Sequence, residues 1–138
     1  MQLFPYLNFN GDCEAALNFY QSIFGGEIVG LSRFGESPME VSDADKNRVM
    51  NATFNFGNGS SLMASDSMPG QDVTSGSNIT LCIGTEDIEA TNRCFAQLAE
   101  GGLITMPLDN TFWGARFGML TDKYGISWMF NCELPKEE

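Results

Sequence analysis

The sequence contains no histidine, and this absence excludes more chemistry than any other feature of the composition. Histidine is the commonest metal ligand and the usual general acid or base near neutral pH. Histidine-based metal sites, Ser-His-Asp triads and Cys-His dyads are therefore excluded together. Any catalysis by this chain must use carboxylates, Cys, Tyr, Lys or Arg.

Basic residues are also scarce, and long apolar runs are missing. Seven Lys and Arg stand against eighteen Asp and Glu, so the formal net charge is −11. A chain this acidic is poorly suited to nucleic-acid backbones and anionic membranes, which attract basic surfaces. No run of about 18 apolar residues occurs, so we expect no membrane span. The N-terminus lacks the basic and apolar regions of a signal peptide, which predicts a cytoplasmic protein.

The cysteines give no sign of a metal site. Cys13, Cys82, Cys94 and Cys132 form no Cys-x-x-Cys motif, so a structural zinc site is not expected. Free thiols in a reducing compartment are the simplest interpretation. The composition as a whole, 138 residues of which 43% are hydrophobic, predicts one folded domain over residues 1–138.

The first half of the chain predicts a strand, a helix and three further strands. A helix ending at Gly25-Gly26 is indicated by apolar residues at helical spacing: Cys13, Ala16, Leu17, Tyr20 and Phe24. Strands are predicted over residues 2–9, 27–34, 49–56 and 60–65. Residues 35–47 are polar and acidic and predict a solvated loop. They lack the ligand spacing of a calcium site.

A linker over residues 67–77 is followed by the same order of elements. The second helix is predicted to begin at Thr85 as N-cap, with Glu86 and Asp87 in its first turn, and to end at Gly101-Gly102. Its buried stripe is predicted to comprise Ile88, Thr91, Phe95 and Leu98. Strands are predicted over residues 78–83, 103–107, 112–121 and 126–132.

The two halves form an internal repeat. Equivalent positions lie 76 residues apart in the early elements, as Leu7 and Ile83 do, and 66 apart in the later ones, as Met63 and Met129 do. The predicted fold class is α+β, with two βαβββ modules in tandem over about 1–66 and 78–133. A helix covers one face of each sheet, so we expect the two mixed sheets to curl around a shared concavity.

Two stretches carry a family resemblance. The first is Pro5-Tyr-Leu-Asn-Phe-Asn-Gly-Asp-Cys-Glu-Ala-Ala-Leu-Asn-Phe-Tyr20, followed by Phe24-Gly-Gly-Glu27. The second is Phe112-Trp-Gly-Ala-Arg-Phe-Gly, which continues through Asp122-Lys-Tyr-Gly-Ile-Ser-Trp-Met-Phe-Asn131. With the paired modules, they resemble the PhnB-like subgroup of the vicinal oxygen chelate superfamily, which includes glyoxalase I, extradiol dioxygenases and bleomycin-resistance proteins. The resemblance implies a glyoxalase-like fold and a homodimer.

The resemblance also implies where a metal would be held. Enzymes of the superfamily bind a divalent metal in the concavity through His and Glu ligands on the first and last strands of each module. The corresponding positions here are Phe4 or Pro5, Met63, Asn78 and Met129. Because Phe, Pro and Met are not ligands for such ions and a single Asn is too weak, we expect neither a metal nor another cofactor.

A ligand pocket in the concavity is the predicted site. Its expected lining combines an apolar wall with a few polar anchors: Asn8, Met63, Asn78, Thr80, Cys82, Trp113, Arg116 and Met129. Arg116 could clamp a carboxylate or phosphonate, or make a structural contact instead. Met63 and Met129 could line the pocket or fill the core, and because no Cys or His lies near them in sequence we expect no Cu(I) site.

These features favour a metal-independent protein that binds a small molecule. The alternative is a lyase or isomerase with a non-standard site, which needs a titratable group in the concavity. Some PhnB-like relatives carry a demethylubiquinone methyltransferase label. Asn10-Gly11-Asp12 holds a single glycine, so the fingerprint of a nucleotide-type cofactor is absent and the label gains no support.

Overall fold

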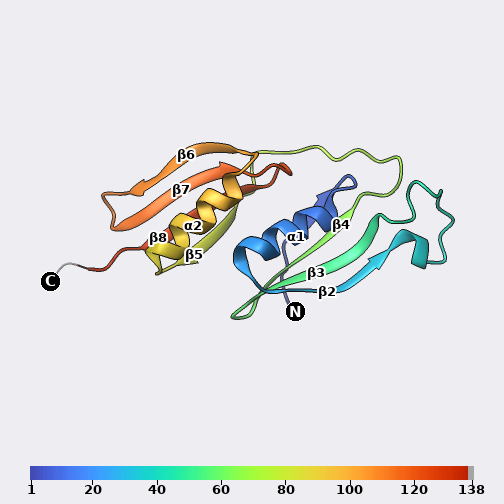
Figure 1. The fold of residues 1–138 in the computed structure, drawn as a ribbon, viewed down its shortest axis with the longest axis horizontal. Helices are drawn as coiled ribbons and strands as arrows, with labels where there is room; N and C mark the ends of the chain where they lie inside the picture. The colour runs from blue at the N-terminus through green and yellow to red at the C-terminus, as the bar shows by residue number, and fades with distance from the viewer. Residues whose placement is uncertain (137–138) are drawn as a thin grey trace. The chain divides into compact units, whose positions relative to one another are not determined.

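The computed structural model describes residues 1–136 and divides the chain into two compact units. The first unit is Met1–Thr74, and the second begins at Ser75. Each unit contains one long helix and four strands (Figure 1).

In the first unit a mixed sheet carries a single helix on one face. Its elements are β1 (Tyr6–Phe9), α1 (Cys13–Phe24), β2 (Glu27–Arg33), the short 3-10 helix η1 (Phe34–Glu36), β3 (Val49–Gly57) and β4 (Ser60–Asp66). The strand order is β1-β4-β3-β2. The β1 and β4 strands are parallel, and the other neighbours are antiparallel.

The second unit repeats this topology. Its elements are β5 (Leu81–Thr85), α2 (Ile88–Ala99), β6 (Leu103–Asn110), β7 (Ala115–Thr121) and β8 (Ser127–Glu133), with strand order β5-β8-β7-β6. Met63 is paired with Tyr6 in the first unit, and Met129 is paired with Cys82 in the second. The predicted repeat, its offsets and the α+β class with two mixed sheets are therefore confirmed.

The core of each unit lies between its helix and one face of its sheet. In the first unit Leu17 and Tyr20 of α1 are fully buried, as are Phe54 and Ala64 of the sheet. In the second unit the rings of Phe95 and Phe130 meet edge to face at 5.6 Å, and Leu98 and Trp128 are also buried. Full burial of a large apolar side chain stabilises a fold by about 1.5–3 kcal/mol.

The first strand of each unit is shorter than the sequence predicted. The β1 strand begins at Tyr6 rather than at residue 2, and β5 begins at Leu81 rather than at residue 78. Leu3 and Ile79, assigned to those strands by alternation, are 95% and 75% exposed. Pro5 has no N–H to donate to a ladder, although its carbonyl still accepts a hydrogen bond from the Met63 amide.

Three local predictions are corrected. The N-cap of α2 is Asp87, whose carboxylate accepts a hydrogen bond from the Ala90 amide, whereas Thr85 ends β5. Ile23 rather than Phe24 completes the buried stripe of α1. Phe112 and Trp113 lie in the turn between β6 and β7 and not in a strand, because the chain reverses there through Gly114 at a φ of 87°.

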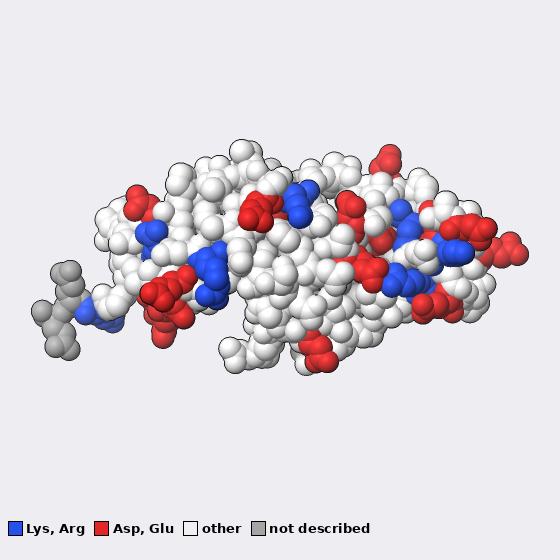
Figure 2. All heavy atoms as spheres, viewed as in Figure 1, with Lys and Arg blue, Asp and Glu red and all other residues white. Residues whose placement is uncertain are grey.

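The loop before β3 is the most highly charged part of the first unit. Figure 2 shows acidic and basic side chains together over this loop, at the right end of the view. Lys46 lies 4.0 Å from Asp43, and both side chains are largely exposed, so this contact adds little stability. No helix in residues 1–136 is long and apolar enough to cross a membrane.

Candidate functional site

A cavity of about 540 Å³ lies in the first unit, beside the ends of β1 and β4. The lining comes from the sheet, from η1 and the loop after it, and from the segment that follows β4. Its apolar members are Phe34, Met39, Met50, Met68 and Val73, and its polar members are Asn8, Ser65, Ser67, Gln71, Thr74, Asp66 and Asp72. The lining thus combines apolar walls with polar groups, as the lining of a small-molecule site does.

Hydrogen bonds hold the segment after β4 in place as one wall of the cavity. The Ser67 amide donates to the Phe9 carbonyl at 2.6 Å, and the Ser67 hydroxyl donates to the Gln71 carbonyl at 2.9 Å. Arg48 donates from Nη2 to the carbonyl and hydroxyl oxygens of Ser67, both at 2.9 Å, and to the side chain of Asn10. The wall is therefore tied both to β1 and to the residue that precedes β3.

Asp66 forms part of the cavity lining and organises the backbone around it. Its carboxylate is buried and accepts three backbone hydrogen bonds, from Gly11 at 2.8 Å, Cys13 at 3.0 Å and Val49 at 2.8 Å. The Cys13 amide is the first of α1 and Gly11 lies just before that helix, whose dipole stabilises a negative charge at its start. Asp66 therefore joins the ends of β1 and β4 to the start of α1 and of β3.

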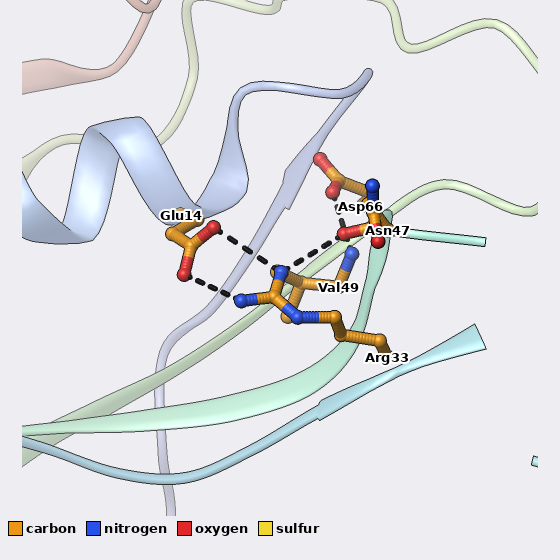
Figure 3. A network of polar contacts seen from close by, with 5 residues as sticks. All are labelled: Glu14, Arg33, Asn47, Val49 and Asp66. Atoms are coloured by element: carbon orange, nitrogen blue, oxygen red, sulfur yellow. Dashed lines mark hydrogen bonds and ion pairs between the residues drawn. The ribbon is translucent and has the colours of Figure 1, made fainter. Parts of the chain in front are cut away.

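A charged pair between α1 and the end of β2 lies near Asp66, and Figure 3 shows its contacts. Arg33 donates to both carboxylate oxygens of Glu14, at 3.2 and 2.8 Å, and to the Asn47 carbonyl at 3.0 Å. The hydrogen bond from Arg33 lowers the pKa of the Glu14 carboxyl. Through these contacts α1 holds both ends of the loop that carries Phe34 and Met39.

The structure brings only part of the predicted pocket together. Asn8 lines the cavity of the first unit, and Met63 lies on the sheet face opposite α1 but outside the cavity lining. Cys82 and Met129 are paired neighbours on the second sheet. Asn78 and Thr80 precede β5 instead of lying within it.

Arg116 makes the structural contact that was one of its two predicted alternatives, and Trp113 lies outside the cavity lining. The Arg116 guanidinium donates to the Asn92 side chain of α2 at 2.7 Å and to the Asn110 side chain at 3.1 Å. Arg116 therefore faces the helix side of its sheet, where it makes a structural contact. Trp113 lies in the exposed β6–β7 turn and packs against the ring of Phe117.

Several residues of the site were not predicted from the sequence. Asp66 had no assignable partner, because its three hydrogen-bond donors lie 17 to 55 residues away. Met39 and Met68 fall in segments that were expected to be solvated loop or linker, and Phe34, expected at the end of a strand, begins η1 instead. The only signal in the sequence was the presence of large apolar residues inside those polar stretches.

The residues at the superfamily's metal positions do not fit a divalent ion. Those positions hold Phe4 or Pro5, Met63, Asn78 and Met129, which provide at most one oxygen ligand. Within residues 1–136, no three His, Cys, Asp or Glu side chains lie close enough together to hold a metal.

The family model described as 3-demethylubiquinone-9 3-methyltransferase matches residues 1–130. The chain belongs to this family. Protein YjdN of Escherichia coli is 36% identical to this chain, and the match covers 95% of each protein.

Solved structures agree with this family assignment. Protein PA1353 of Pseudomonas aeruginosa is 39% identical, with a TM-score of 0.88 over 98% of this chain and 99% of that one. A Bacillus cereus structure, titled a putative 3-demethylubiquinone-9 3-methyltransferase, PhnB protein, is 35% identical, with a TM-score of 0.81 over 96% and 99%. A glyoxylase/bleomycin resistance protein/dioxygenase domain from Frankia shares the fold. The PhnB-like resemblance is confirmed, and the Frankia domain, which is 14% identical, bears out the expected glyoxalase-like fold.

Proposed function

We propose that this family member binds a small organic molecule in the cavity of the first unit, without a divalent metal. The observation that carries the proposal is the cavity itself, whose volume of about 540 Å³ suits such a ligand. Met39, Met50 and Met68 supply flexible, polarizable walls that adapt to ligand shape. Asn8 and Gln71 supply amide groups that can orient a polar part of the ligand.

The family's methyltransferase description is not the basis of this proposal. A nucleotide-type cofactor is often bound by backbone amides where a first strand turns into a helix. At the corresponding turn here, the amides of Gly11 and Cys13 donate to the Asp66 carboxylate. Those donors are therefore engaged within the protein, which argues against that mode of cofactor binding.

An enzyme with a non-standard site is the alternative, and the cavity favours it less. Lyase or isomerase chemistry needs a side chain that can move a proton to or from the ligand. Asp66 is buried, but its two oxygens already accept three amide hydrogen bonds. Asp72 lines the cavity but is exposed to solvent, which does not suit a proton-transfer group that must be shielded from water.

Two further parts of the proposal concern the protein's setting. Cys13, Cys82 and Cys132 are free thiols, which suits a reducing compartment such as the cytoplasm. Phe112 and Trp113 are 98% and 57% exposed, which would suit burial between two copies in a homodimer.

The test is a small-molecule screen in the presence of EDTA, followed by methyl NMR of the methionines. Binding in the cavity should shift the methyl signals of Met39, Met50 and Met68. Asn8→Ala should then weaken binding by about fivefold to tenfold, the cost of one lost hydrogen bond. Asn18→Ala is the matched control, because Asn18 is an exposed asparagine of α1 outside the cavity.

Two outcomes would contradict the proposal. One is ligand binding that disappears when EDTA is present and returns with a divalent metal. The other is binding that leaves the three methionine signals of the cavity unchanged. Turnover of a bound ligand would instead support the enzyme alternative.

A further inference from the structure

A row of sulfur-containing side chains crosses the whole sheet of the second unit. Cys82 of β5 is paired with Met129 of β8, and Met129 is paired with Met119 of β7. Met119 is in turn paired with Met106 of β6. Directly opposed residues of neighbouring strands project from the same face of a sheet. Every position of this row, from one edge strand to the other, therefore presents sulfur on one face.

The sulfur row lies on the face that α2 does not cover. Leu120, Trp128 and Phe130 alternate with the row along β7 and β8 and are buried, and Phe130 meets Phe95 of α2. Successive side chains of a strand point to opposite faces, so Met119 and Met129 point away from the helix. Both are partly buried, whereas Cys82 is exposed and Met106 is 46% exposed.

The fold does not require sulfur at these positions. The first unit has the same topology, and its equivalent row comprises Tyr6, Met63, Thr53 and Val29. A tyrosine, a threonine and a valine there occupy the positions of Cys82, Met119 and Met106. The sulfur row is therefore a property of the second sheet's sequence, and the first unit provides an internal comparison.

We propose that Cys82, Met129 and Met119 form a binding site for Cu(I), with Met106 at its edge. Soft thiolate and thioether ligands select Cu(I), and the site offers no imidazole for other transition metals. Adjacent strands lie about 4.8 Å apart, and methionine has three rotatable bonds, so sulfurs from neighbouring strands can converge on one ion. This site is separate from the cavity, and ligand binding in the cavity does not depend on it.

Binding at this site is a ligand exchange without oxidation or reduction. The Cys82 thiol loses its proton to solvent, and the thiolate forms a bond to Cu(I). The thioethers of Met129 and Met119 each donate a sulfur lone pair to the ion. The ion keeps its charge of +1 throughout, and one proton is released for each ion bound.

The test measures Cu(I) affinity by competition with bicinchoninate, in anaerobic buffer with ascorbate. Wild-type protein should bind one Cu(I) per chain. Met129→Leu and Met119→Leu should each weaken binding by about tenfold or more, and Cys82→Ser should weaken it further. Met63→Leu is the matched control, because Met63 occupies the Met129 position in the first unit, and it should leave the affinity unchanged.

Silver(I), which does not change oxidation state here, gives a second readout. Adding silver(I) should shift the methyl signals of Met119 and Met129 and leave that of Met63 in place. The dispersion of the methyl signals also shows whether each variant is folded. No Cu(I) binding would overturn the proposal. Equal affinity in wild type and both Met→Leu variants would also overturn it, because the ion would then be held by the Cys82 thiol alone.

Discussion

At the scale of single residues, Asp66 has the largest structural role in the first unit. It joins α1, β3 and the cavity wall through three buried hydrogen bonds, and a buried amide left without a partner is costly. Asp66→Ala should lower the free energy of unfolding by about 3 kcal/mol, measured by urea denaturation. Asp72→Ala, at an exposed carboxylate of the same cavity, should change it by less than about 0.5 kcal/mol. Equal effects of the two substitutions would contradict the role assigned to Asp66.

Cys13 gives a prediction about pH. Burial, aided by the charges of Asp66 and Glu14, raises the pKa of its thiol from 9.0 to about 12. Because the folded-state pKa is the higher one, the associated stability is complete below pH 9 and is lost as the pH rises toward 12.

The pH prediction is tested by urea unfolding at pH 8 and at about pH 10.5. Wild type should lose about 2 kcal/mol more between these two values than Cys13→Ala does, because the variant lacks the thiol. The difference between pH values is the readout, so any uniform cost of the substitution cancels. Identical pH dependence in both proteins would show that Cys13 does not titrate abnormally.

At the scale of elements, two equivalent glycines allow the chain that leaves each helix to pass close to the backbone of the neighbouring strand. A β-carbon added at Gly26 would overlap the Asn55 carbonyl oxygen, and one added at Gly102 would overlap that of Thr121. Gly26→Ala and Gly102→Ala should each destabilise their unit by about 1–3 kcal/mol, measured by thermal and urea unfolding. Gly84→Ala is the control, because a β-carbon there has no neighbour within 4 Å. A neutral result at both Gly26 and Gly102 would contradict the packing described.

The elements themselves were largely predictable from the sequence. Helical periodicity and paired glycines located α1 and α2, and the repeat at offsets of 76 and 66 predicted the duplicated topology. Strand ends were less accurate, because β1 and β5 begin where pairing with β4 and β8 begins. Pairing of this kind depends on distant residues that local alternation does not reveal.

The site was predictable only in part, and for a similar reason. Asn8 was identified, because it alternates with buried residues of β1. The rest of the cavity depends on loops whose positions are set by Asp66, Arg33 and Arg48 through contacts between distant segments. Cys82 and Met129 are 47 residues apart in sequence, so their pairing became evident only from the sheet register.

At the scale of the whole molecule, the chain keeps the fold of its relatives but lacks the side chains that would bind a divalent metal. The chain belongs to a family whose wider fold relatives include a glyoxylase/bleomycin resistance protein/dioxygenase domain. Its own residues at the superfamily's metal positions are poor ligands for divalent ions. The two units share one topology, yet the first carries the cavity and the second carries the sulfur row. The duplicated fold thus supports different side-chain chemistry in its two halves.

The central claim, that the first-unit cavity binds a small molecule without a divalent metal, is tested most directly by native mass spectrometry. Gently purified, untagged protein would be measured alone and with ligands from the screen. We predict one ligand per chain, no stoichiometric Zn, Ni, Fe or Mn, and a species at twice the chain mass of 15.1 kDa. One such metal per chain, required for the ligand to remain bound, would contradict the account.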